Sequence, residues 1–157
     1  MINQSEFKER LSRLVTKRTK SVNAGGCTGS IFALDFSDQT VDRADEKNVT
    51  DDCLMVKCSW RLDDIKHVRP VTGWQEDSDE QGVMTLRLKS LINDIVNKVE
   101  ISPFNDLEIF FESGKRLFVF CDMTPYVEGD FNWFLKTSEG IYAVNLNLKC
   151  IFERNQN

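Results

Sequence analysis

Alternating apolar and polar residues recur along most of the chain and predict a protein built mainly from strands. Leu54, Val56, Cys58 and Trp60 occupy every second position, so we expect one strand over 52–62. Similar patterns, bounded by turn residues, predict the other strands. These cover 19–24, 29–37, 97–102, 106–112, 116–121, 131–137, 141–146 and 148–153, with a further strand near 67–71.

Two segments carry helical spacing instead. The first follows Ser5, a suitable N-cap, and predicts a helix near 5–18, whereas the second predicts a helix near 83–95. Their apolar faces are Phe7, Leu11, Leu14 and Val15 in the first helix and Leu88, Leu91, Ile92 and Ile95 in the second. Strands follow each helix without regular helices between them, which favours an α+β fold over a doubly wound parallel sheet.

The two helical segments also resemble each other. Leu11 recurs as Leu88, and Leu14 recurs as Leu91 at the same distance along the chain. We call this constant step, from Leu11 to Leu88, the repeat offset. Such self-similarity indicates a repeated unit.

Each copy closes on a strand that contains a tryptophan, Trp60 or Trp133, which we interpret as core residues. We therefore predict a single α+β domain, 1–157, with approximate two-fold symmetry. It would hold two helix-plus-antiparallel-meander repeats, 5–62 and 83–137, joined by 63–82. One helix with a few strands leaves an apolar sheet face exposed, so we expect the two units to pack together.

Composition narrows the classes of partner. The chain has 157 residues and a net charge of −5, with acidic groups concentrated in 35–52 and 76–80. An acidic protein lacks the basic face that phosphate groups require, so nucleic acid is not expected as a partner. No window approaches a membrane span, and the N-terminus lacks a signal pattern. Five cysteines without a CxxC pair favour reduced thiols, and we expect a cytoplasmic protein.

Candidate catalytic and metal-binding patterns are sparse. His67 is the only histidine, so nucleophilic catalysis of the Ser-His or Cys-His kind would depend on it, but it is typical of an ordinary surface or hydrogen-bonded histidine. The glycine-rich segment 25–30 lacks the GK[ST] ending of a phosphate loop and predicts a turn with positive φ. The sequence thus predicts no catalytic residue, no metal site and no cofactor.

The acidic segments offer a surface for a basic protein. Trp74 lies in a polar context beside acidic residues, where an exposed aromatic side chain can anchor a partner. The candidate partner-binding residues are Asp42, Asp45, Glu46, Trp74, Glu76, Asp77, Asp79 and Glu80. Solubility alone also explains acidic loops, and Trp74 can pack on a sheet edge instead.

Several segments carry a resemblance to known proteins. These are Gly29-Ser30-Ile31-Phe32-Ala33-Leu34-Asp35-Phe36, Cys58-Ser59-Trp60-Arg61-Leu62, Leu107-Glu108-Ile109-Phe110-Phe111 and Asn132-Trp133-Phe134-Leu135. The chain resembles a group of small uncharacterised bacterial proteins and is similar to small immunity proteins of bacterial toxin systems. The resemblance implies a cytoplasmic, non-enzymatic bacterial protein that binds and blocks a toxin. It supplies no catalytic residues.

Two other classes of function remain as alternatives. One is a small-ligand-binding protein or enzyme with a pocket between the two repeats, which a cleft holding His67 or converging carboxylates would favour. The other is an oligomerisation module that pairs through an exposed sheet edge. The sequence leaves the oligomeric state open.

Overall fold

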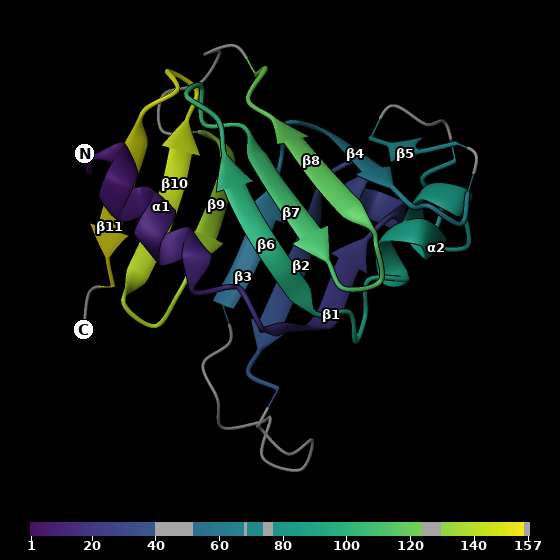
Figure 1. Cartoon of the computed structure of the whole chain (residues 1–157). Coiled ribbons are helices and arrows are strands. Elements are labelled where there is room, and N and C mark those ends of the chain that lie inside the picture. The colour runs from purple at the N-terminus through teal and green to yellow at the C-terminus, as the bar shows by residue number, and fades with distance from the viewer. Residues whose placement is uncertain (40–51, 68, 74–76, 124–129, 156–157) are drawn as a thin grey trace.

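Two antiparallel sheets, one in front of the other, form the body of the computed structural model (Figure 1). It describes residues 1–39, 52–67, 69–73, 77–123 and 130–155. These described residues form two α-helices, one short 3-10 turn and eleven strands, so the fold is mixed and mostly β, in line with the expected α+β class.

The larger sheet has the order β1 (Arg18–Ala24), β2 (Phe32–Ser37), β3 (Asp52–Val56), β9 (Phe131–Lys136), β10 (Gly140–Asn145) and β11 (Cys150–Arg154). The smaller sheet has the order β5 (Val71–Thr72), β4 (Ser59–Asp63), β8 (Arg116–Phe120), β7 (Leu107–Phe111) and β6 (Val96–Ile101). Helices α1 (Gln4–Ser12) and α2 (Val83–Lys89) lie at opposite ends of the molecule, α1 at the left and α2 at the right in Figure 1.

The strands are exchanged between the two halves of the chain. Strands β4 and β5 leave β1–β3 and join β6–β8, whereas β9 and β10 join β1–β3. The expectation that each half is a self-contained meander closed by its own tryptophan strand is therefore wrong. The exchange begins where the amides of Lys57 and Cys58 both donate to the carbonyl of Asn132, which ends the pairing of β3 with β9.

Both helices are shorter than their apolar patterns predict. Helix α1 begins after Asn3, not Ser5, because the Asn3 side chain accepts the Glu6 amide at 2.8 Å. The chain then turns at Thr16 and Asn93, whose φ angles of 74° and 70° are incompatible with a continued helix. Helix α1 packs against β6, and α2 packs against β1 and β5.

Three strand predictions need correction. Strand β2 begins at Phe32 and not at 29, because Gly26–Thr28 form a 3-10 turn. The predicted strand over 52–62 is two strands, and the one near 67–71 is reduced to the two residues of β5. The other strands lie within two residues of their predicted bounds.

Hydrogen bonds where β1 meets β6 occur in pairs that are related by the repeat offset. The amide of Thr16 donates to the carbonyl of Val96, and the amide of Asn93 donates to the carbonyl of Thr19, each at 2.8 Å. Thr16 and Asn93 are one repeat offset apart, and so are Thr19 and Val96. The donors of the two bonds, and likewise their acceptors, are therefore related by the same step along the chain. The same step relates the register shift between Thr19 and Ser21 in β1 to that between Val96 and Lys98 in β6. The backbone bonds and register shifts at this junction thus recur at the repeat offset.

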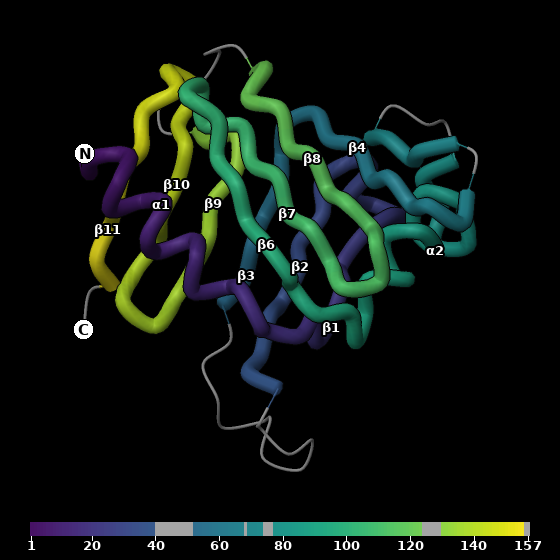
Figure 2. Tube along the Cα trace, viewed as in Figure 1, coloured from purple at the N-terminus to yellow at the C-terminus, as the bar shows by residue number. Residues whose placement is uncertain are grey.

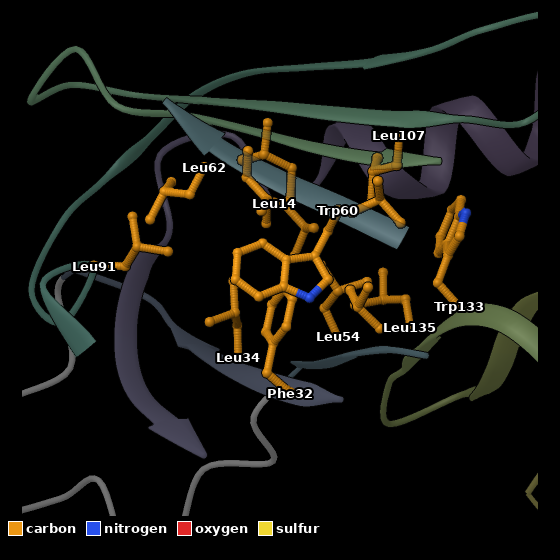
Figure 3. Close-up of a cluster of buried hydrophobic side chains, with 14 of the residues drawn as sticks. Leu14, Phe32, Leu34, Leu54, Trp60, Leu62, Leu91, Leu107, Trp133 and Leu135 are labelled. Carbon is orange, nitrogen blue, oxygen red and sulfur yellow. The ribbon is translucent and has the colours of Figure 1, made fainter. Parts of the chain in front are cut away.

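The core fills the space between the sheets, and Trp60 and Trp133 lie at separate places within it (Figure 3). Both side chains are buried, which confirms their predicted place in the core. Each indole also donates a hydrogen bond: Trp60 Nε1 to the Ser30 carbonyl at 2.7 Å and Trp133 Nε1 to the Asn105 carbonyl at 3.1 Å. The polar atom of each large ring is thereby satisfied inside an apolar cluster.

Candidate functional site

Three of the predicted partner-binding residues lie in the described part of the chain. Asp77, Asp79 and Glu80 are found in the loop that leads into α2, and all three are exposed there. Asp42, Asp45, Glu46, Trp74 and Glu76 lie outside the described residues. The predicted acidic surface is thus represented in the structure by this loop.

Helix α2 exposes apolar side chains beside that loop. Val83 and Leu86 are 51% and 49% exposed, and their spacing of three residues puts them on one side of the helix. The acidic Asp79 and Glu80 lie in the loop shortly before the helix, separated from it by Gln81 and Gly82. We call Asp79, Glu80, Val83 and Leu86 the α2 surface. Sequence reasoning missed its apolar part, although the helical pattern leaves Val83 and Leu86 off the predicted buried face.

Asp77 has a structural role next to the α2 surface. Its Oδ2 accepts the Val83 amide at 3.2 Å, which supplies a side-chain acceptor at a helix whose N-cap, Gly82, has none. The negative charge also complements the partial positive charge at the start of the helix.

The predicted glycine turn holds the acidic loop in place. The Gly26 amide donates to the Ser78 carbonyl at 2.8 Å. A Cβ on Gly25 would lie 2.1 Å from Thr85 Oγ1, so only glycine fits between the loop and α2. The φ angles of Gly25, Gly26 and Gly29 are 79°, 59° and 59°, which confirms the predicted positive-φ turn.

His67 lines a shallow surface pocket of about 340 Å³ together with Arg61, Asp63, Asp64, Ile65 and Pro70. Its Nε2 lies 3.6 Å from Asp64 Oδ2, and Asp64 Oδ1 accepts the Lys66 amide at 3.0 Å. An imidazole paired with a carboxylate can exchange a proton with a bound molecule. The six lining residues include two carboxylates and no serine, threonine or cysteine.

The outer face of the smaller sheet carries alternating cations and phenylalanines. The Arg116 guanidinium lies 4.5 Å from the Phe118 ring centre and 4.6 Å from that of Phe110. Arg61 covers Phe118 at 4.5 Å, and Lys98 covers Phe110 at 5.3 Å. Such cation–π contacts hold the side chains of this face in fixed positions.

Each cation of this face also has a carboxylate partner. The pairs are Arg61 with Asp63, Arg116 with Glu108 and Lys98 with Glu100. The hydrogen bond from Lys98 lowers the pKa of Glu100. A pocket of about 350 Å³ adjoins the face and is lined by Lys8, Glu100, Glu108, Phe118 and Phe120, among others. These three pairs compensate the charges of Arg61, Arg116 and Lys98, which weakens the attraction of those cations for an anionic ligand.

No group of three or more His, Cys, Asp or Glu side chains among the described residues could hold a metal ion. None of the described helices is long and apolar enough to cross a lipid bilayer.

Comparison of the chain with protein families, with curated proteins and with solved structures finds no match.

Proposed function

We propose that the protein is a non-enzymatic binding protein of the immunity type, which neutralises a basic partner protein by covering its active surface. The α2 surface carries this proposal, because half-exposed Val83 and Leu86 follow the exposed acidic residues Asp79 and Glu80 closely along the chain. Protein interfaces commonly combine an apolar centre with a polar rim. An acidic rim attracts a basic partner over a distance and keeps other acidic proteins away.

The surface is also held in a fixed shape before any partner arrives. Gly26 and Asp77 bind the loop and the start of α2 through their hydrogen bonds to Ser78 and Val83. A preformed surface loses less conformational entropy on binding, which favours affinity.

The decisive experiment measures capture of a partner by the full chain immobilised on a resin and exposed to an extract of its native host. The double variant Asp79→Lys with Glu80→Lys and the single variant Leu86→Asp should each weaken affinity for the purified captured protein at least tenfold. Raising the salt concentration should weaken binding of the unaltered chain. Glu153→Lys is the matched control, because it reverses an exposed charge on β11, at the opposite side of the molecule (Figure 1), and should change affinity less than twofold.

Two results would overturn the proposal. One is that no basic protein is retained, and the other is that the retained protein binds all variants equally. The immunity role has its own readout: expression of the captured protein in host cells should arrest growth only when the chain is absent.

A second candidate, a small-ligand-binding protein, is favoured by the pocket that brings His67, Asp64 and Arg61 together. A ligand that needs the proton-exchanging pair should raise the Tm of the unaltered chain but not of His67→Gln. A screen of small anions and amines that produces no His67-dependent shift would exclude this candidate.

We also infer that the two halves, approximately 5–62 and 83–137, are copies of one unit that have exchanged their last strands. The inference is supported by the hydrogen bonds paired at the repeat offset and by the strand orders β1-β2-β3-β9-β10 and β6-β7-β8-β4-β5, which are equivalent when the halves are interchanged. In this proposal neither half would have a complete sheet without the other.

A further inference from the structure

Two cysteines face each other where the chain crosses between the sheets. Ser59 of β4 is paired with Phe120 of β8 at the end of their antiparallel ladder. The ladder ends there, and the next residues beyond it are Cys58, which lies in a bend, and Cys121, whose side chain interacts with that of Cys58. Both lie on the core side of their strands, because Cys58 is in phase with buried Trp60 and Cys121 with buried Val119.

The backbone bonds show which kind of cross-strand pair this is. The Cys121 amide donates to Asp106 Oδ1 at 2.8 Å, and the Cys58 amide donates to the Asn132 carbonyl at 3.1 Å. Neither backbone amide donates to the other cysteine, so the β4–β8 register, continued by one step, would make them a non-hydrogen-bonded pair. In such pairs the Cα atoms are about 4.5 Å apart, which lies within the range of about 4.4–6.8 Å that disulfides span.

The two thiols differ in their access to solvent. Cys58 is buried, whereas Cys121 is half-buried and its Sγ donates to the Asn105 carbonyl at 3.2 Å. A hydrogen bond with Cys121, reinforced by burial, raises the pKa of Cys58 far above its ordinary range. An oxidant from solution therefore reaches Cys121 first, and Cys58 is the thiol that completes the reaction.

We propose that Cys58 and Cys121 are a redox modification site, which forms a reversible disulfide with a low-molecular-weight disulfide such as oxidised glutathione as the oxidant. The Cys121 thiolate attacks one sulfur of oxidised glutathione, forms a mixed disulfide and releases one glutathione thiolate, which takes up the proton. The Cys58 sulfur then attacks Cys121 Sγ, which breaks the mixed disulfide and releases the second glutathione as a thiolate, and this thiolate takes up the proton that Cys58 loses. The two cysteines are oxidised by two electrons, and one molecule of oxidised glutathione becomes two of reduced glutathione.

The disulfide would connect the two halves of the chain. It would join β4 to β8 across the register where their ladder ends, and so enclose residues 58–121 in a covalent loop. A bond that closes so long a loop restricts the unfolded chain strongly, which stabilises the folded state.

The other three cysteines provide internal comparisons. Cys27 is exposed in the 3-10 turn, and Cys53 lies in β3 of the other sheet. Cys150 is the competitor, because it is buried in β11 and its Sγ donates to Asn105 Oδ1 at 3.4 Å. Cys150 and Cys121 both donate hydrogen bonds to Asn105, but Cys150 belongs to β11, which pairs with β10 and not with β4 or β8.

The test is incubation of the full, folded chain with oxidised glutathione, followed by mass spectrometry of the intact protein and of its peptides. The intact mass should fall by two hydrogen atoms, and the linked peptides should contain Cys58 and Cys121. Dithiothreitol should restore the original mass. The Tm of the oxidised protein should rise by several degrees and return after reduction.

Cys58→Ala and Cys121→Ala should each abolish the link, whereas Cys27→Ala should leave its yield unchanged. Peptide mapping of the unaltered chain keeps the test valid if either core variant fails to fold. A link between Cys121 and Cys150, or glutathione adducts at Cys27 alone, would overturn the proposal.

Discussion

Thr16 and Asn93, which are separated by the repeat offset, share the same left-handed backbone conformation, with φ angles of 74° and 70°. Each follows the helical segment of its half and donates its amide across the junction between the sheets. The conformation strains the two residues unequally, because a β-branched side chain is disfavoured at positive φ and asparagine tolerates it.

Replacing Thr16 with glycine should therefore stabilise the protein. Thr16 is exposed, so the variant loses little packing, and relief of the strained conformation should raise the free energy of unfolding by about 1 kcal/mol. Chemical denaturation measures the change. Asn93→Gly is the matched control and should change stability by less than about 0.5 kcal/mol. Equal effects at both positions would contradict this explanation.

Replacing Gly25 with alanine should be strongly destabilising. The new Cβ would lie 2.1 Å from Thr85 Oγ1, and the φ angle of 79° is itself unfavourable for alanine. We expect a loss of about 2–4 kcal/mol in the free energy of unfolding. Gly29→Ala is the control, since Gly29 has a φ of 59° with nothing within 4 Å of its Cβ, and should lose only about 1 kcal/mol. A similar loss in both variants would show that the contact with Thr85 is unimportant.

Trp60→Phe and Trp133→Phe should destabilise the protein by similar amounts. Each substitution leaves a small cavity and removes one indole hydrogen bond, to Ser30 or to Asn105, in a fully packed core. We expect each to lower the free energy of unfolding by about 2–3 kcal/mol. Thermal or urea unfolding of both variants measures the difference. A loss in one variant that is more than twice the loss in the other would argue against equivalent roles.

Asp130 should contribute stability that disappears in acid. The hydrogen bond from Lys57, with a second from the Phe131 amide, holds the pKa of Asp130 below its ordinary value of 3.8. A carboxyl group whose pKa is lowered in the folded state stabilises that state at pH values above the pKa of the group in the unfolded chain. This contribution is lost as the pH falls through the pKa of the group in the folded state. Because the pair is partly exposed, we expect Asp130→Asn to cost only about 0.5–1 kcal/mol at pH 7.

The pH dependence provides the check on that pair. Urea unfolding between pH 7 and pH 3 should show the unaltered chain and Asp130→Asn converging below about pH 4. Lys57→Met should reduce the same pH dependence. A constant difference between the curves at all pH values would show that charge is not the cause.

The sequence allowed most strand positions to be predicted, but not the exchange of strands. Leu54, Val56, Cys58, Trp60 and Leu62 alternate without interruption and so resemble one strand. The chain nevertheless changes sheets just after Val56. The alternation survives because both sheets direct the same set of side chains into one shared core. Periodicity reports which face is buried and carries no information about which strand is the neighbour.

The helix ends were missed for a related reason. Leu91 is buried and continues the apolar pattern, yet α2 ends at Lys89. Leu91 lies in a turn in which its backbone amide donates a hydrogen bond to the Leu88 carbonyl, so its side chain still reaches the core. The conformation of Asn93, which ends the turn, is not marked by a glycine.

The sequence predicted only the part of the candidate site that is marked by a cluster of acidic residues. Charge indicated the loop at Asp79 and Glu80, which the structure places before α2. The pocket around His67 depends instead on a fold that one sequence does not specify.

The path of the chain between the sheets, visible as a continuous trace in Figure 2, has a mechanical consequence. Because β4 is paired with β8 and β3 with β9, each half is held by ladders that belong to the other half. A protease that cuts the chain between the two halves would therefore break the covalent connection, but the two fragments would stay bound to each other. The nicked molecule should sediment as one particle until denaturant separates its pieces.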